Sequence, residues 1–80
     1  MAATILVVED DPSIRQLLVI NQESSGHRVI EAGSAEEAEQ LVTTSLPDLI
    51  LLDWMLPGRS GPQFAARLRE AERTAEVPII

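Results

Sequence analysis

The sequence predicts an α/β fold built on a parallel sheet, and two observations carry this prediction. Short aliphatic runs alternate with amphipathic stretches of helix length along the chain. The run at residues 4–8, and the four aliphatic residues inside the run at 48–53, show no alternation with polar residues, which is typical of strands covered on both faces. The order strand, helix, strand, helix, strand, helix, strand then favours right-handed crossovers between parallel strands.

Turn and cap residues predict where the first elements begin and end. Asp11, followed by a proline, has an acceptor side chain suited to the N-cap of the first helix, and Gly26 is a plausible stop. Residues 28–32 predict a second strand, and their two polar positions suit the edge of a sheet. Ser34 and Glu37 have the spacing of a capping box, in which a hydroxyl and a carboxylate satisfy free amides in both directions.

The helices are expected to be amphipathic. Apolar side chains on one face of the first helix are Ile14, Leu17 and Leu18. After a turn-rich loop at residues 54–59, those on one face of the third helix are Phe64, Leu68 and Ala71. A fourth strand begins at Val77, and residues 77–80 are cut while still apolar. We therefore expect an incomplete doubly wound sheet rather than a whole domain.

Composition excludes several classes of function. The 80 residues include 13 acidic side chains and 6 basic ones, all arginine, for a formal charge of −7. Because there is no cysteine, disulfides, thiolate catalysis and cysteine zinc sites are excluded. The acidic balance disfavours direct contact with nucleic acid. The longest apolar run, Leu49–Leu52, is too short to span a membrane, and a cytoplasmic location is expected.

Acidic residues follow two of the predicted strands. Glu9 and Asp10 end the first strand and Asp53 ends the third, so the three carboxylates converge if those strands are neighbours. Like charges about 4 Å apart repel by about 4 kcal/mol at an effective dielectric near 20, so such a cluster favours a bound cation. Oxygen donors alone favour Mg²⁺, with Asp10 and Asp53 as ligands, Glu9 in or beside the inner shell, and the backbone carbonyl of Met55 completing the set.

Each of these residues also has a structural interpretation. Asp11 is expected to be only a helix cap. Glu9 and Asp10, taken alone, fit an ordinary solvated strand end about as well as a metal site. An aspartate that opens a turn, as Asp53 does, is common. Both features together at matched strand ends favour the functional interpretation.

The motifs together resemble a known family. The run from Ile5 to Asp11, with Pro57 four residues after Asp53 and Gly61 four residues later, closely resembles the receiver domain of two-component response regulators. The stretch 47–58 is similar to the OmpR/PhoB-like winged-helix branch. The resemblance covers essentially the whole chain, and the combination of motifs is highly specific.

This resemblance implies a flavodoxin-like (CheY-like) fold with strand order 2-1-3-4-5, which makes the first and third strands neighbours. It implies that Asp53 accepts a phosphoryl group from a phosphohistidine on a sensor histidine kinase. Glu9, Asp10, Asp53 and the Met55 carbonyl would hold Mg²⁺, which lowers the repulsion between carboxylate and phosphoryl group. The parent protein is then expected to be a DNA-binding transcription regulator, with the receiver itself not a turnover enzyme.

The sequence also departs from the family pattern. The family has a Ser or Thr at the end of its fourth strand and a Lys at the end of its fifth, whereas this sequence stops at Ile80 and contains no lysine. We therefore expect residues 1–80 to be a truncated receiver domain without an output domain. Its open apolar edge and face predict self-association or partial folding of the isolated segment.

Two alternatives remain open from the sequence. One is a pseudo-receiver, an interaction module that takes no phosphate. The other is a Mg²⁺-dependent phosphatase of the haloacid-dehalogenase type, which needs a second aspartate two residues after its nucleophile. That position is Met55, so the phosphatase interpretation is weak. A dinucleotide-binding fold is disfavoured because the first turn is acidic rather than rich in glycine.

Overall fold

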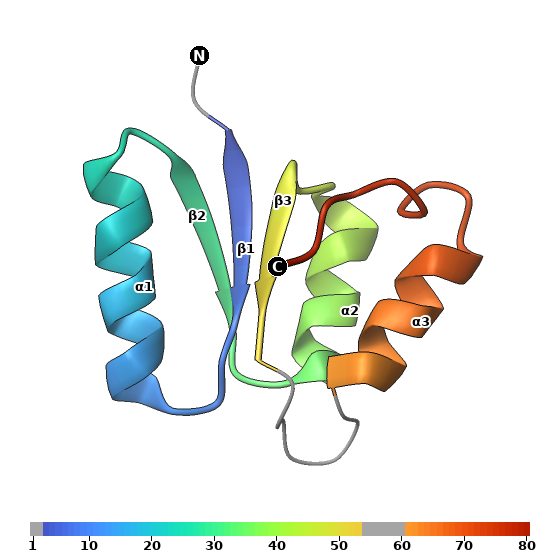
Figure 1. The fold of residues 1–80 in the computed structure, drawn as a ribbon, viewed down its shortest axis with the longest axis horizontal. Helices are drawn as coiled ribbons and strands as arrows, with labels where there is room; N and C mark the ends of the chain where they lie inside the picture. Colours follow the sequence, from blue (N-terminus) through green and yellow to red (C-terminus); the bar gives the residue numbers. More distant parts are fainter. Residues whose placement is uncertain (1–2, 54–60) are drawn as a thin grey trace.

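The structure is a computed structural model that describes residues 3–53 and 61–80. Strands and helices alternate along these residues, as the sequence predicts (Figure 1). In chain order the elements are β1 (Thr4–Val8), α1 (Pro12–Ser24), β2 (Arg28–Ala32), α2 (Ala35–Thr44), β3 (Leu49–Leu52) and α3 (Gly61–Glu70). The first two strands have the bounds expected from the sequence.

The three strands form one parallel sheet in the order β2-β1-β3. In its register Val8 of β1 pairs with Ala32 on one side and with Leu52 on the other, so all three strands end at the same edge. This is the order implied by a flavodoxin-like fold, and the predicted fold class is confirmed. β2 occupies the edge position that its polar residues predicted.

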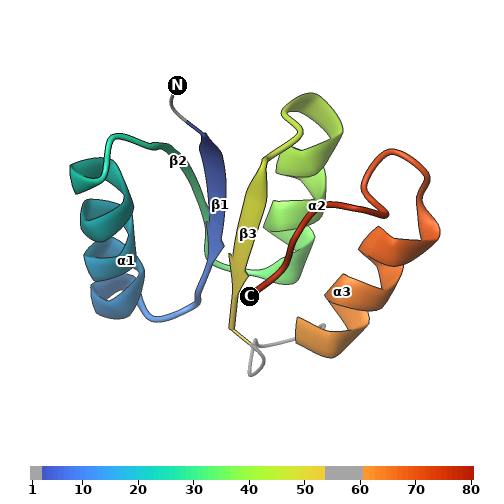
Figure 2. The ribbon, with the colours of Figure 1, turned by 45° about the horizontal axis from the view of Figure 1, so that its top comes forward.

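Helices α2 and α3 pack on one face of the sheet and form the main core with it (Figure 2). Leu6 and Ile50 from the sheet meet Phe64 of α3 in this layer, and each is at most 1% exposed. The other buried members of the core are Val8, Ala32, Ala35, Ala38, Val42, Leu52, Leu68 and Val77. Alternation along β3, where Ile50 and Leu52 are buried, directs its larger contacts to this face.

Helix α1 lies on the opposite face, over β1 and β2 (Figure 2). Ile5 and Val7 are buried on this side of the sheet. In the predicted apolar face of α1, Leu18 is half-buried, whereas Ile14 and Leu17 are 49% and 60% exposed. Within the described residues α1 is the one helix on this face, so its apolar stripe is only partly covered.

The predicted caps of α1 are present. The Asp11 carboxylate accepts hydrogen bonds from the backbone N–H groups of Ser13 (2.9 Å) and Ile14 (3.2 Å). The helix ends at Ser24, and Gly26 two residues later has a φ of 87°, the left-handed conformation that favours glycine.

The cap of α2 differs in one detail from a standard capping box. The Ser34 hydroxyl accepts a hydrogen bond from the N–H of Glu37 at 3.1 Å, as predicted. The Glu37 carboxylate, however, accepts from the N–H of Gly33 at 2.7 Å, one residue before the N-cap. Both side chains still satisfy amides at the start of the helix.

The end of the chain returns to the sheet beside β3 (Figure 1). Ile79 forms an isolated parallel bridge with Ile50, so the fourth strand predicted at residues 77–80 is present as a single bridge. β3 is thereby flanked by β1 on one side and by the Ile79 bridge on the other. The prediction for Ala71 was wrong: α3 ends at Glu70, which leaves Ala71 past the helix and exposed.

Across the part of the chain that the structure describes, no helix has both the length and the apolar character that a bilayer crossing requires.

The packing predicts a large difference between two chemically identical substitutions. Ile50→Val removes one methylene from a side chain that is 0% exposed, so it should lower the free energy of unfolding by about 0.5–1.5 kcal/mol. Ile20→Val removes the same group from a side chain that is 51% exposed and should change it by less than about 0.5 kcal/mol. Urea unfolding followed by circular dichroism measures both, and equal effects would contradict the assigned core.

Candidate functional site

The carboxyl-terminal edge of the sheet brings the predicted acidic residues together. Glu9 is the first residue after β1, and Asp53 is the first residue after β3. Backbone bonds fix both positions, because the N–H of Asp53 donates to the Val8 carbonyl and that of Glu9 to the Ala32 carbonyl, each at 3.0 Å. The parallel ladder therefore holds both acidic residues in place one step beyond the strands.

Carboxylate oxygens of Glu9, Asp10 and Asp53 lie within 4.8 Å of one another. Glu9 is only 8% exposed, Asp53 is half-buried and Asp10 is exposed. Three hard oxygen donors at this spacing, with one side open, fit a divalent cation such as Mg²⁺. The structure thus brings the three side chains together, while their individual roles stay predictions.

The buried member of the cluster has an altered acidity. Burial raises the pKa of the Glu9 carboxyl above its ordinary value, because the charged form loses its hydration. The neighbouring carboxyl groups of Asp10 and Asp53 raise this pKa further, while a hydrogen bond from the N–H of Asp11 (3.1 Å) opposes the rise. The cluster therefore contains one carboxyl that resists ionisation when no cation is bound.

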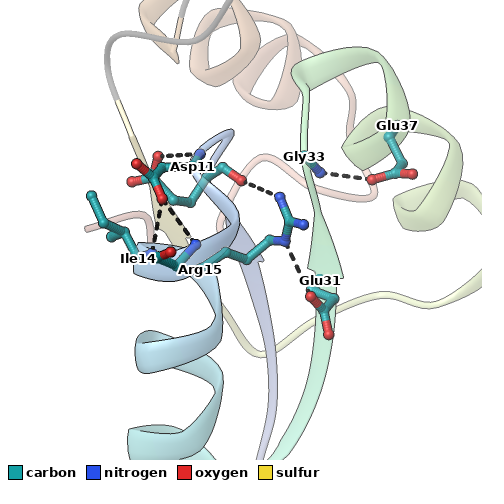
Figure 3. A network of polar contacts seen from close by, with 8 residues as sticks. Asp11, Ile14, Arg15, Glu31, Gly33 and Glu37 are labelled. Carbon is teal, nitrogen blue, oxygen red and sulfur yellow. Dashed lines mark hydrogen bonds and ion pairs between the residues drawn. The ribbon is translucent and has the colours of Figure 1, made fainter.

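Two residues next to the cluster support it without belonging to it. Asp11 uses its carboxylate to cap α1, which is the structural interpretation that the sequence predicted. Arg15, which the sequence reasoning missed, donates from Nη1 to the backbone carbonyl of Glu9 at 2.9 Å and from Nε to Glu31 at 3.1 Å (Figure 3). Its only signal in the sequence is its place six residues after Glu9, which lets the side chain fold back toward the end of β1.

The remaining predicted ligand, the backbone carbonyl of Met55, lies outside the described residues. So do Pro57 and the rest of the segment 54–60 on which the resemblance partly rests.

An open hollow of about 260 Å³ borders the acidic cluster. Its lining combines two of the acidic residues with apolar ones: Glu9, Asp53, Val8, Leu18, Leu51, Leu52 and Ile80. Two larger hollows, of about 470 and 560 Å³, lie near the carboxyl ends of α2 and α3, and neither is lined by the acidic residues that follow β1 and β3. Within the described residues, the one group of carboxylates that could hold a metal ion borders the smaller hollow. The smaller hollow is therefore the candidate site.

Comparison with known families gives a match over most of the chain. Residues 5–80 match the family model described as the response regulator receiver domain. The chain belongs to the response regulator receiver domain family.

Relatives of this receiver domain include two transcription regulators. The phosphate regulon transcriptional regulatory protein PhoB of Pseudomonas aeruginosa is 44% identical over 77 residues, which are 96% of this chain and 34% of that protein. The DNA-binding dual master transcriptional regulator RpaA of Synechocystis is 42% identical over 76 residues, 95% of this chain and 32% of that protein. The receiver chain thus spans about a third of the length of these curated relatives.

Solved receiver structures have the same fold. The N-terminal domain of a response regulator receiver protein from Methanoculleus marisnigri has a TM-score of 0.94 and 35% identity, covering 99% of this chain and 64% of that one. The chemotaxis response regulator CheY4 of Vibrio cholerae has a TM-score of 0.95 and 28% identity, covering 99% and 66%.

The acidity of Glu9 predicts a pH-dependent stability in this receiver domain. Because its folded-state pKa is raised, the stability linked to the protonated carboxyl is fully present below the ordinary pKa and is lost as pH rises through the raised one. The Glu9→Gln variant has no carboxyl to ionise at this position, so its stability does not fall in this way as pH rises. In the presence of a chelator it should melt at a higher temperature than the wild type at about pH 7, and the difference should shrink toward about pH 4.

Thermal unfolding followed by circular dichroism at the two pH values measures this difference. Glu36→Gln, on the exposed face of α2, is the matched control and should show no comparable change. A melting difference for Glu9→Gln that is equal at both pH values would contradict the raised pKa.

Proposed function

We propose that this receiver domain is a phosphoacceptor in a two-component phosphorelay, with Asp53 as the residue that accepts the phosphoryl group. The observation that carries the proposal is the approach of the Asp53 carboxylate to within 4.8 Å of those of Glu9 and Asp10 at the edge where β1 and β3 end. Membership of the receiver family supports the same role.

The three carboxylates have different environments, which supports different tasks. Asp53 is half-buried beside an open hollow, so one of its oxygens can attack an incoming phosphorus atom. In that step a P–O bond forms to Asp53 and the P–N bond of the donor phosphohistidine breaks, leaving the electron pair on the imidazole nitrogen. Asp10 and Glu9 are proposed to hold Mg²⁺ together with Asp53 and the Met55 carbonyl. When bound, Mg²⁺ supplies positive charge that offsets the repulsion between the carboxylate and the phosphoryl oxygens.

The proposed donor is a sensor histidine kinase, and the proposed parent protein is a cytoplasmic, DNA-binding transcription regulator. Relatives such as PhoB and RpaA, whose names describe transcription regulators, support the second point. The acidic charge of −7 supports assigning DNA contact to a part of the parent protein other than this segment. The domain is proposed to be phosphorylated once rather than to turn over substrate, and self-association of residues 1–80 stays a prediction.

Phosphorylation of a single residue provides the test. Incubation of the full-length protein with Mg²⁺ and acetyl phosphate should add one phosphoryl group, detected by intact-mass spectrometry, because the donor brings the leaving group that Asp53 needs. Asp53→Asn should abolish this gain, and so should removal of Mg²⁺ with a chelator, since either change removes a component of the same step.

Asp48→Asn is the matched control, because Asp48 precedes β3 at the opposite end of the strand from Asp53. Its carboxylate accepts a backbone hydrogen bond from Thr4 at 2.7 Å, which an asparagine oxygen can also accept, so labelling should persist. Continuous release of inorganic phosphate instead of a stable label would favour the phosphatase alternative. Absence of any label on the folded wild type would favour the pseudo-receiver.

A further inference from the structure

Arg15 connects three segments around the acidic cluster. From the first turns of α1, its guanidinium donates through Nη1 to the Glu9 carbonyl at 2.9 Å and through Nε to the Glu31 carboxylate of β2 at 3.1 Å (Figure 3). The Arg15 side chain is 22% exposed, which is low for an arginine, and that of Glu31 is 55% exposed. The two bonds leave the planar guanidinium little freedom to rotate.

Gly33 forms the wall beside this guanidinium. A Cβ atom at residue 33 would lie 3.2 Å from Arg15 Nη1, closer than an ordinary contact. The Gly33 backbone is itself held, since its N–H donates to Glu37 at 2.7 Å (Figure 3). The loop after β2 therefore leaves a slot that the Arg15 side chain occupies.

The carbonyl that Arg15 binds belongs to the peptide bond between Glu9 and Asp10. Because a peptide bond is planar, a bond to its oxygen restricts rotation of the whole peptide unit and so limits where the Cα atoms of Glu9 and Asp10 can lie. Other bonds hold Glu9 before and after this peptide: its N–H donates to Ala32 at 3.0 Å, and its carboxylate accepts from the N–H of Asp11 at 3.1 Å. Arg15 supplies the bond to the peptide oxygen between them.

We propose that Arg15 is a positioning residue for the cation site, acting through the Glu9–Asp10 peptide and held in place by Glu31. This inference rests on the proposed function, because it assumes that Glu9 and Asp10 bind a divalent cation. If Arg15 acted through its charge alone, it would weaken cation binding instead of favouring it. A positive group beside the cluster repels a cation, and Glu31 neutralises only part of that charge. Positioning and charge therefore predict changes of opposite sign when Arg15 is replaced.

The test measures the affinity of the purified full-length protein for Mn²⁺, a stand-in for Mg²⁺ that also prefers oxygen ligands, from the electron paramagnetic resonance of the free ion. Arg15→Gln should weaken binding about tenfold, the lower end of the range seen when groups that orient metal ligands are removed. Arg15→Lys keeps the positive charge but loses the paired donors of the planar guanidinium, so it should weaken Mn²⁺ binding about threefold. Charge alone predicts tighter binding for Arg15→Gln and no change for Arg15→Lys.

Arg69→Gln is the matched control. Arg69 lies in the last turn of α3 and also donates to two backbone carbonyls, those of Ala75 and Val77. Its Mn²⁺ affinity should equal that of the wild type. Circular dichroism checks that each variant is folded, and Arg15→Lys carries the test if Arg15→Gln is not.

The outcomes separate the two proposals. If the wild type binds Mn²⁺, Asp10→Asn abolishes binding, and Arg15→Gln and Arg15→Lys bind as tightly as the wild type or more tightly, then the role of Arg15 is overturned and the cation site stands. If the folded wild type does not bind Mn²⁺ at all, the cation site is overturned and the role of Arg15 with it.

Discussion

The parallel pairing of β1 with β3 is the constraint on which the site depends. It pairs residues 44 positions apart, such as Val8 with Leu52, and the N–H of Asp53 donates to the carbonyl of Val8, the residue before Glu9. The register is fixed by burial: Ile50 and Leu52 face the core with α2 and α3, and a slip of one residue would turn them out of it. The same slip would turn the Asp53 side chain to the other face, so core packing and site geometry are specified together.

The convergence of the carboxylates lowers the stability of the fold locally through electrostatic repulsion. Three carboxylates converge, and burial makes Glu9 harder to ionise. The surrounding backbone offsets part of the repulsion. The N–H of Asp11 donates to the Glu9 carboxylate, and the amino-terminal end of α1 at Pro12, the positive end of the helix dipole, lies next to it in the chain. A cation bound by the folded chain alone would offset the remainder, and cation binding and folding would then be thermodynamically linked. Functional sites often show this kind of local conflict within an otherwise consistent fold.

How much could be predicted from the sequence follows from the range of each interaction. Strand positions and the caps at Asp11 and Ser34 could be predicted, because they depend on neighbouring residues. The convergence of Asp53 with Glu9 needed the strand order, which the family resemblance supplied. The Arg15 contact could not be predicted, because it depends on where β2 and the loop containing Gly33 lie beside α1. The end of α3 before Ala71 was also missed, since apolar periodicity does not show where a helix stops.

The position of the cluster between two unlike faces explains how a change at Asp53 could affect the rest of the domain. On one side lies the closed core beneath α2 and α3, and on the other the hollow bordered by Leu18, Leu51 and Ile80. Apolar walls weaken dielectric screening, so charges there interact more strongly than on an open surface. A phosphoryl group on Asp53 would replace the single negative charge of that carboxylate with about two on the phosphoryl oxygens beside Glu9, whose burial already disfavours ionisation. Because Glu9 is bonded to β2 through Ala32 and to α1 through Arg15, a change in its charge or position would act on both elements at once.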